Sequence, residues 1–155
     1  MTRLAPILLS LLALTVASCD GDDAPSQRDF AEQANEICRS AKQSLKDVAE
    51  GARSPDEIVT AIDRVIEESR DTVDDLADLE RPEGEAGEVA EQFVNAIRTE
   101  IQDEGIPALE DLRGAVESEE REAIQEAARR LQRIDSSASN RAARAVGATD
   151  CAEDQ

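Results

Sequence analysis

Apolar residues recur at intervals of three and four along every long segment after residue 28, and none of these segments shows the alternating pattern of a β-strand. Such spacing places the apolar side chains on one face of an α-helix. The sequence therefore predicts an all-α fold in which each helix buries one face against its neighbours.

Four such segments are separated by short breaks at residues 51–54, 80–85 and 116–119. Short connections make consecutive helices antiparallel neighbours, so we expect an up-down-up-down four-helix bundle over residues 29–151. In chain order, the apolar positions are Phe30, Ala34, Ile37, Cys38, Ala41, Leu45 and Val48; Ile58, Ile62, Val65, Ser69, Val73, Leu76 and Leu79; Val89, Phe93, Ile97, Ile101, Leu109, Leu112 and Val116; and Ile124, Ala127, Leu131, Ile134, Ala138, Ala142 and Ala145.

Local signals mark the ends of the predicted helices. Ser54-Pro55-Asp56-Glu57 combines an N-cap serine, a proline at the first helical position and the glutamate of a capping box. Gly51 stands where a helix commonly ends in a left-handed turn. Gly105-Ile106-Pro107 predicts a kink in the third helix, because proline lacks an N–H donor and clashes with the preceding turn. The kink is either static or a hinge that opens a groove. The fourth helix is expected to begin near Ser118 and to end before Gly147.

The first 18 residues have a different character. Arg3 supplies one positive charge and residues 4–17 are almost entirely apolar, which is the layout of a secretory signal peptide. The run is shorter than the roughly 20 residues that span a bilayer. Its end, Val16-Ala17-Ser18-Cys19, resembles the bacterial lipobox. That resemblance implies cleavage before Cys19 and a lipid anchor on its thiol, and an ordinary signal peptide with a chance cysteine is the alternative.

Residues 19–28 are small, acidic or turn-forming, and we expect a flexible acidic tether there. At ~3.3 to 3.6 Å per residue it would span about 30 Å. Residues 152–155 form an acidic tail. This organisation predicts a lipid-anchored domain held close to the extracytoplasmic face of the cell membrane.

The chain is strongly acidic, with 36 acidic and 17 basic residues and a formal net charge of −19. Such a charge repels nucleic-acid phosphates and anionic headgroups. Nucleic-acid binding is therefore excluded, and membrane attachment is expected to come from the lipid on Cys19. The charge either keeps the domain soluble or attracts a basic protein or loosely bound divalent cations.

Histidine, tryptophan and tyrosine are absent from the sequence. The chain thus lacks the usual general base and the Glu-x-x-His motif of di-iron bundles, and it has neither an EF-hand pattern nor a glycine-rich phosphate loop. We expect no catalytic residue, no cofactor and no metal site. Asn95, Thr72 and Ser69 lie on or beside the apolar positions, where they either line a small polar pocket or bond to a helix carbonyl.

Cys38 and Cys151 remain once Cys19 carries lipid. They are an even number of thiols in a chain sent to a thiol-poor compartment, and antiparallel helices bring the chain end back beside the first helix. We therefore expect a disulfide between them. A redox-active or metal-binding pair is the alternative, although the chain has no CxxC spacing and no nearby basic cluster to lower a thiol pKa.

Three stretches of the domain resemble small actinobacterial lipoproteins and secreted proteins. They are Phe30-Ala31-Glu32-Gln33-Ala34-Asn35-Glu36-Ile37-Cys38, Leu79-Glu80-Arg81-Pro82 and Gly147-Ala148-Thr149-Asp150-Cys151. The basic residues are nearly all arginine, which is typical of a high-GC genome. The resemblance implies a helical bundle with the disulfide, and it implies no particular activity.

These observations predict a non-enzymatic, membrane-tethered interaction module whose partner is a basic extracytoplasmic protein. The alternative is a carrier or sensor that holds a small apolar ligand or lipid within the bundle. A cavity larger than a few side chains would favour the carrier, and a filled core would favour the interaction module.

Overall fold

The computed structural model describes residues 24–49 and 52–152, and within these ranges the fold is all-α. The chain forms four antiparallel rods, as the sequence predicts. Their elements are α1 (Gln27–Ala49), α2 (Pro55–Asp78), α3 (Gly84–Arg98), the π-helix η1 (Thr99–Gly105), α4 (Ile106–Glu117), α5 (Arg121–Gln132), α6 (Ser137–Val146) and the short 3₁₀-helix η2 (Thr149–Cys151).

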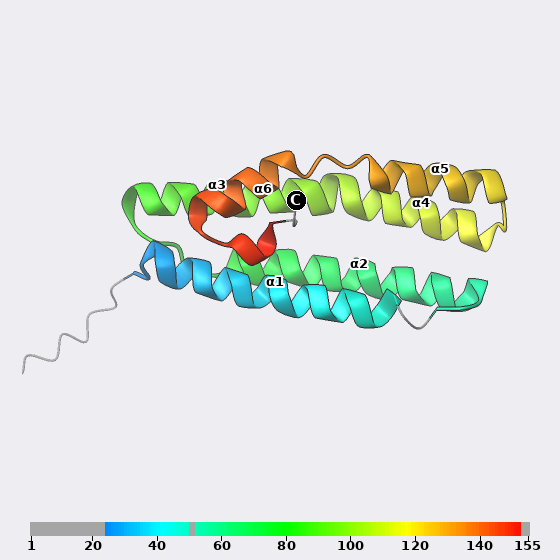
Figure 1. Cartoon of the computed structure of the whole chain (residues 1–155), viewed down its shortest axis with the longest axis horizontal. Coiled ribbons are helices and arrows are strands. Elements are labelled where there is room, and N and C mark those ends of the chain that lie inside the picture. Colours follow the sequence, from blue (N-terminus) through cyan, green and yellow to red (C-terminus); the bar gives the residue numbers. More distant parts are fainter. Residues whose placement is uncertain (1–23, 50–51, 153–155) are drawn as a thin grey trace, which may run out of the picture.

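The rods are arranged in two layers in an elongated molecule (Figure 1). α1 and α2 form one layer, whereas α3, η1 and α4 run beside α5 and α6 in the other. α1 packs against α2, α2 against α4, α4 against α5, and α3 against α6. The described part of the chain contains no helix that is both long and apolar enough to cross a bilayer.

Two groups of buried side chains hold the rods together. The proximal core lies where α1 and α3 begin and α2 and α6 end, and Phe30 and Phe93 meet edge to face in it with ring centroids 6.2 Å apart. The distal core lies between α4 and the first half of α2, and it consists of Ile62, Ile66, Ile106 and Val116. Ile101 in η1 packs against both cores.

The third rod changes its helical winding near the predicted kink. Residues 99–105 form a π-helix, and at its end the N–H of Ile106 donates to the carbonyl of Ile101. Pro107 then lies in the first turn of α4, where its missing N–H costs no helical hydrogen bond. The wider π turn lets the chain pass Gly105 and Pro107 without leaving the helical path.

The fourth rod is bent at residues 133–136, so the fourth helix expected from near Ser118 to Gly147 consists of two helical segments, α5 and α6. Asp135 accepts a hydrogen bond from the N–H of Ser137 at 2.9 Å, and the N–H of Arg133 turns back to Arg130. Short polar side chains compete with the helical ladder for backbone groups. The Asp135-Ser136-Ser137 sequence therefore ends one helix and begins the next. Ile134 nevertheless lies at the position that the apolar spacing of a continuous helix would give it.

The predicted cap signals are confirmed where the structure describes them. The Ser54 hydroxyl accepts from the N–H of Glu57, and the Glu57 side chain accepts in return from the N–H of Ser54. Gly147 ends α6 with a φ of 94°, a left-handed conformation that costs glycine little. Gly51 lies outside the described residues.

Candidate functional site

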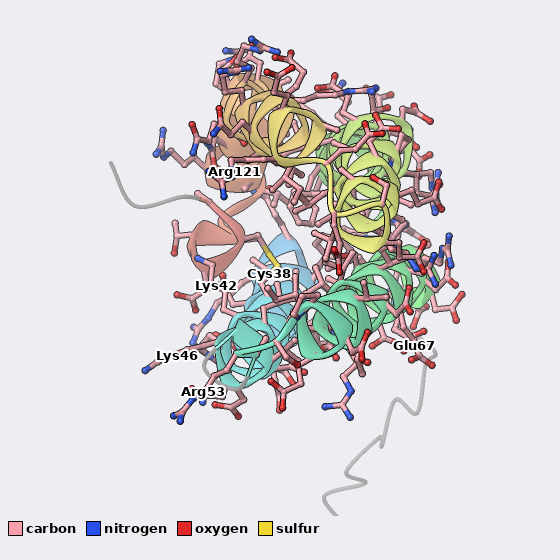
Figure 2. The ribbon with its side chains drawn as sticks, turned by 90° about the vertical axis from the view of Figure 1, so that its right-hand side faces the viewer. Cys38, Lys42, Lys46, Arg53, Glu67 and Arg121 are labelled. Atoms are coloured by element: carbon pink, nitrogen blue, oxygen red, sulfur yellow. A yellow bond between two sulfur atoms is a disulfide. The ribbon has the colours of Figure 1, made fainter. Side chains whose placement is uncertain are left out.

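The three cysteines singled out by sequence fall into two groups. Cys19 lies outside the described residues, so its lipidation stays a prediction. Cys38 and Cys151 are joined by a disulfide that links α1 to η2. Their Cα atoms are 5.1 Å apart, and the two residues are 113 positions apart in sequence. Figure 2 shows this bond between the two elements.

The disulfide belongs to a larger attachment of residues 147–152, the C-terminal hook, to the polar side of α1. The Asn35 amide donates to the carbonyl of Gly147 at 3.3 Å, and its oxygen accepts from the N–H of Asp150 at 2.7 Å. The Asp150 carboxylate pairs with Arg39 at 3.0 Å, and the Lys42 ammonium donates to the carbonyl of Ala152 at 3.1 Å. Four contacts besides the disulfide therefore hold the chain end on the first helix.

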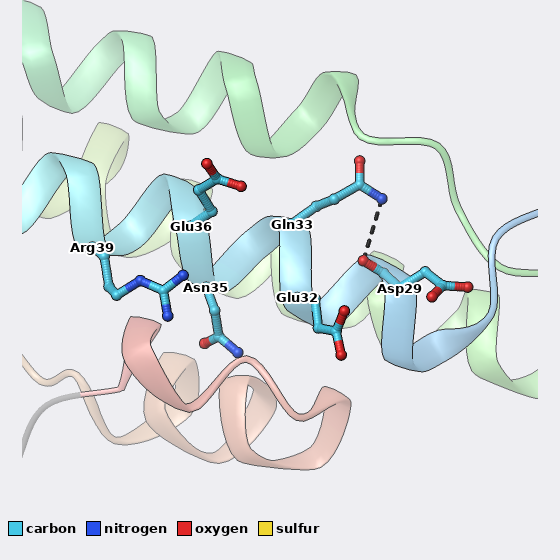
Figure 3. Close-up of a pocket in the computed structure, with 6 residues that line it drawn as sticks. All are labelled: Asp29, Glu32, Gln33, Asn35, Glu36 and Arg39. Carbon is cyan, nitrogen blue, oxygen red and sulfur yellow. Dashed lines mark hydrogen bonds between the residues drawn. The ribbon is translucent and has the colours of Figure 1, made fainter.

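An open depression lies on α1 beside the hook (Figure 3). Its lining residues are Asp29, Glu32, Gln33, Asn35, Glu36 and Arg39. All six come from one helix, and the Gln33 amide donates to the backbone carbonyl of Asp29 at 3.2 Å. Asn35 and Arg39 are already bound to the hook. The depression offers exposed polar groups without a facing wall, so it is not built to enclose a ligand.

The resolved pKa shifts come from surface hydrogen bonds. Those of the Ser26 hydroxyl and N–H lower the pKa of Asp29, and those of the Arg53 and Ser54 N–H groups lower the pKa of Glu57. Arg129 and then Arg133 lower the pKa of Glu126, and the N–H of Ser137 lowers that of Asp135. All four carboxyls are exposed caps or ion-pair members. None of these shifts makes a carboxyl a proton donor near neutral pH.

The polar residues flagged beside the apolar positions do not build a pocket. The Thr72 hydroxyl donates to the carbonyl of Glu68 at 2.7 Å, which is the helix-carbonyl alternative. Asn95 is exposed and bonds to Glu91 and Arg98 on its own helix. Ser69 is half-buried.

Two polar features were missed by sequence reasoning. Ser139, the buried polar residue of α6, donates to the Glu100 carboxylate and also bonds to the carbonyl of Ser136. The Arg81 guanidinium lies 5.4 Å from the centroid of the Phe30 ring and bonds to backbone carbonyls of its own turn. Both features join residues that are far apart in sequence, so no local sequence pattern could predict them.

Charge is unevenly distributed over the surface. Glu67, Asp71, Asp74 and Asp78 follow one another at intervals of three and four on α2, and all four are exposed. Within the described ranges none of them forms a salt bridge. We call these four residues the acidic stripe. In the described residues, the acidic stripe included, no group of three or more carboxylates or cysteines is arranged to hold a metal ion.

Comparisons with known proteins add no relative to this description: no protein family, no curated protein and no solved structure matches the chain. The fold and its surfaces therefore define the class, a disulfide-closed four-helix bundle whose described part carries its polar chemistry on the outside.

Proposed function

We propose that this chain is an exported lipoprotein, anchored through Cys19, that binds a basic extracytoplasmic protein at the outer face of the cell membrane without catalysing a reaction. The observation that carries the proposal is the acidic stripe on α2. Its carboxylates are exposed and lack salt-bridge partners in the described structure, so a partner can supply the missing cations.

The geometry of the acidic stripe suits a basic segment lying along α2. Residues at intervals of three and four share one helix face, and a rise of 1.5 Å per residue places Glu67 and Asp78 about 16 Å apart along the axis. The stripe is rigid, because the opposite face of α2 carries Ile62, Ile66 and Leu76 into the two cores. A partner with lysine or arginine at matching intervals would meet a preformed row of charges.

The other surfaces support binding over turnover. The carboxyls with resolved pKa shifts are exposed and lowered, whereas general acids need a pKa raised toward the working pH. The largest side chains of the proximal core are fully buried in contact with one another. These features favour a rigid scaffold that presents a charged face.

The anchor is tested by Cys19→Ser. Wild-type protein should enter the detergent phase of a two-phase extraction, and the Cys19→Ser protein should stay in the aqueous phase. Intact-mass measurement of the wild-type chain should show the added lipid. Mature wild-type protein that is free in the medium without lipid would exclude the anchor.

The binding face is tested with the mature chain carrying Cys19→Ser, which contains the whole described bundle. Partners captured from membranes at about 10 mM salt should be lost at about 150 mM, because the Debye length falls from ~30 Å to ~8 Å. Asp71→Asn/Asp74→Asn/Asp78→Asn should abolish capture.

The matched control is Glu85→Gln/Glu88→Gln/Asp103→Asn, which removes the same charge from exposed positions on α3 and η1. This control should capture the partner nearly as well as wild type. Equal loss in both triple variants would mean that only net charge matters, and salt-independent capture would refute an electrostatic partner. Turnover of a substrate by the purified chain would overturn the non-enzymatic assignment.

A further inference from the structure

A surface hollow lies between α2 and α4, beside the acidic stripe. Residues 63–71 of α2 and 110–114 of α4 line it, and its volume is about 650 Å³, which is typical of ligand sites in proteins. Glu67 and Asp71 of the acidic stripe belong to its lining. We call this hollow the notch.

Two ion pairs cross the notch between the helices. Arg113 of α4 donates to Asp63 of α2 at 2.7 Å. Arg70 of α2 donates to Glu110 of α4 at 3.3 Å. Asp63 and Arg70 are seven positions apart, which is about 10 Å along the axis of α2. The notch is therefore bounded at both ends by side chains that already have a partner.

Glu67 stands between these two ion pairs. It lies one helical turn after Asp63 and three positions before Arg70, so the three residues share one face of α2. Its carboxylate is exposed, and in the described residues it forms neither a salt bridge nor a hydrogen bond. The buried side of the lining includes Ile66, which is 6% exposed. The notch thus combines an apolar residue with an uncompensated negative charge.

The lysines of this chain do not supply the missing charge. Lys42 and Lys46 are the lysines of the sequence, and Figure 2 shows both on the opposite side of the molecule from Glu67. The two arginines of the notch are held by the ion pairs at its ends. A cation that pairs with Glu67 would therefore come from another molecule.

Gly114 forms part of the α4 side of the notch. A glycine inside a helix costs about 1 kcal/mol relative to alanine, so its presence needs a reason. Gly114 has no positive φ, and a Cβ at this position would have no neighbouring atom within 4 Å. Packing within the described structure therefore does not require glycine here. A glycine also leaves room for a ligand to approach the backbone closely.

We propose that the notch receives one long basic side chain of the partner, a lysine or an arginine, whose charge pairs with Glu67 and whose methylenes lie over Ile66 and Gly114. Basic side chains cover apolar surface with their stems and keep the charge at the tip, which matches this lining. A metal ion fits less well, because no three carboxylates or cysteines of the described ranges are arranged to hold one.

This inference rests on the proposed function and adds to it the place where one residue of the partner is fixed. The test titrates a synthetic peptide into the mature Cys19→Ser chain at about 10 mM salt, where the Debye length is ~30 Å. The peptide carries four arginines at the intervals of the acidic stripe and one tryptophan. Because the chain has no tryptophan or tyrosine, the peptide fluorescence reports binding directly.

Gly114→Leu fills the notch without changing any charge. It should weaken peptide binding about tenfold, which corresponds to the loss of one close ion pair. Its matched control is Gln125→Leu, which adds the same side chain at an exposed position of α5 and should bind the peptide like wild type. Far-ultraviolet circular dichroism checks that both variants fold.

A second pair of variants tests the charge. Glu67→Gln should also weaken peptide binding about tenfold, whereas Glu85→Gln, at an exposed position of α3, should have a much smaller effect. Gly114→Leu/Glu67→Gln should bind no more weakly than either single variant, because both substitutions remove the same contact.

Wild-type affinity in Gly114→Leu would overturn the inference, and so would equal weakening by Gln125→Leu or additive losses in the double variant. Should Gly114→Leu not fold, equal effects of Glu67→Gln and Glu85→Gln would overturn it. The proposed function fails separately, if Asp71→Asn/Asp74→Asn/Asp78→Asn binds the peptide like wild type. Binding that depends on those three residues but not on Gly114 would leave the acidic stripe standing and remove the notch alone.

Discussion

The two ends of this bundle are built from the same apolar period but are closed in different ways. The proximal core contains Phe30, Phe93 and Leu76, which are fully buried, and the C-terminal hook seals it through the disulfide. The distal core is smaller and has no aromatic ring, and its four buried members keep 6–7% of their surface exposed.

Different interactions hold the edges of the two ends. Around the distal core, Arg113 pairs with Asp63 and Arg70 with Glu110 across α2 and α4. Such exposed ion pairs contribute little to stability. A covalent link and an aromatic pair hold the proximal end, whereas apolar contacts and exposed ion pairs hold the distal end. We therefore expect the distal end to open more readily than the proximal end.

The largest expected effect comes from removing the disulfide. Cys38→Ser/Cys151→Ser should lower the free energy of unfolding by about 4 to 5 kcal/mol on the chain-entropy model, because the bond closes a loop of more than a hundred residues. Urea denaturation measures the loss, and Cys19→Ser is the control that should leave stability unchanged. Equal stability of the two variants would mean that the disulfide does not set the difference between the ends.

The next effect compares one side chain from each end. Phe93→Ala removes a fully buried ring from the proximal core and should cost about 3 to 5 kcal/mol. Leu112→Ala removes a half-buried side chain that packs against the distal core and should cost about 1 kcal/mol, because less apolar surface returns to water and no closed cavity forms. Thermal and urea unfolding of the two variants give the ratio. Similar losses would show that the distal end is packed as tightly as the proximal end.

The apolar period predicted the helices and their inward faces, but it could not predict how completely each face is covered. Leu45 and Val48 continue the series that begins with Phe30 and Ala34, and all four fit one helical face. Only Phe30 and Ala34 are fully buried. Periodicity is a property of one helix, whereas burial depends on which helices meet, so the incomplete burial of Leu45 and Val48 could not be predicted from the sequence.

The disulfide was predictable because only Cys38 and Cys151 remain once Cys19 carries lipid, and because antiparallel helices bring the chain end back beside the first helix. The bond between Ser139 and Glu100, and the contact of Arg81 with Phe30, were not predictable, since each joins distant segments through a single side chain. The bend at residues 133–136 had a local signal in Asp135 and Ser136. The sequence still predicted one helix there, because Ile134, between Leu131 and Ala138, fits the apolar spacing of a continuous helix.

The smallest expected effect concerns the cap that begins the distal end. The Glu57 carboxylate accepts from the N–H groups of Arg53 and Ser54, each at 2.9 Å, and these bonds lower its pKa. A carboxyl whose pKa is lower in the folded state stabilises the fold above its unfolded pKa of about 4.3. That contribution is lost as the pH falls through the lower, folded pKa.

Glu57→Gln should therefore cost a small amount of stability at pH 7, and the difference from wild type should shrink as the pH falls through the folded pKa of Glu57. Side-chain NMR titration gives that pKa directly, and Glu67→Gln, which breaks no hydrogen bond in the described structure, should not lose stability at pH 7. If the distal end opens independently, amide exchange in Glu57→Gln should rise at Ile62 and Val116 and stay unchanged at Phe30 and Phe93. An equal rise in the amide exchange rate at all four residues would show instead that the two ends unfold as one unit. Loss of the cap would then destabilise the disulfide-closed end as much as α2, the helix that the cap begins.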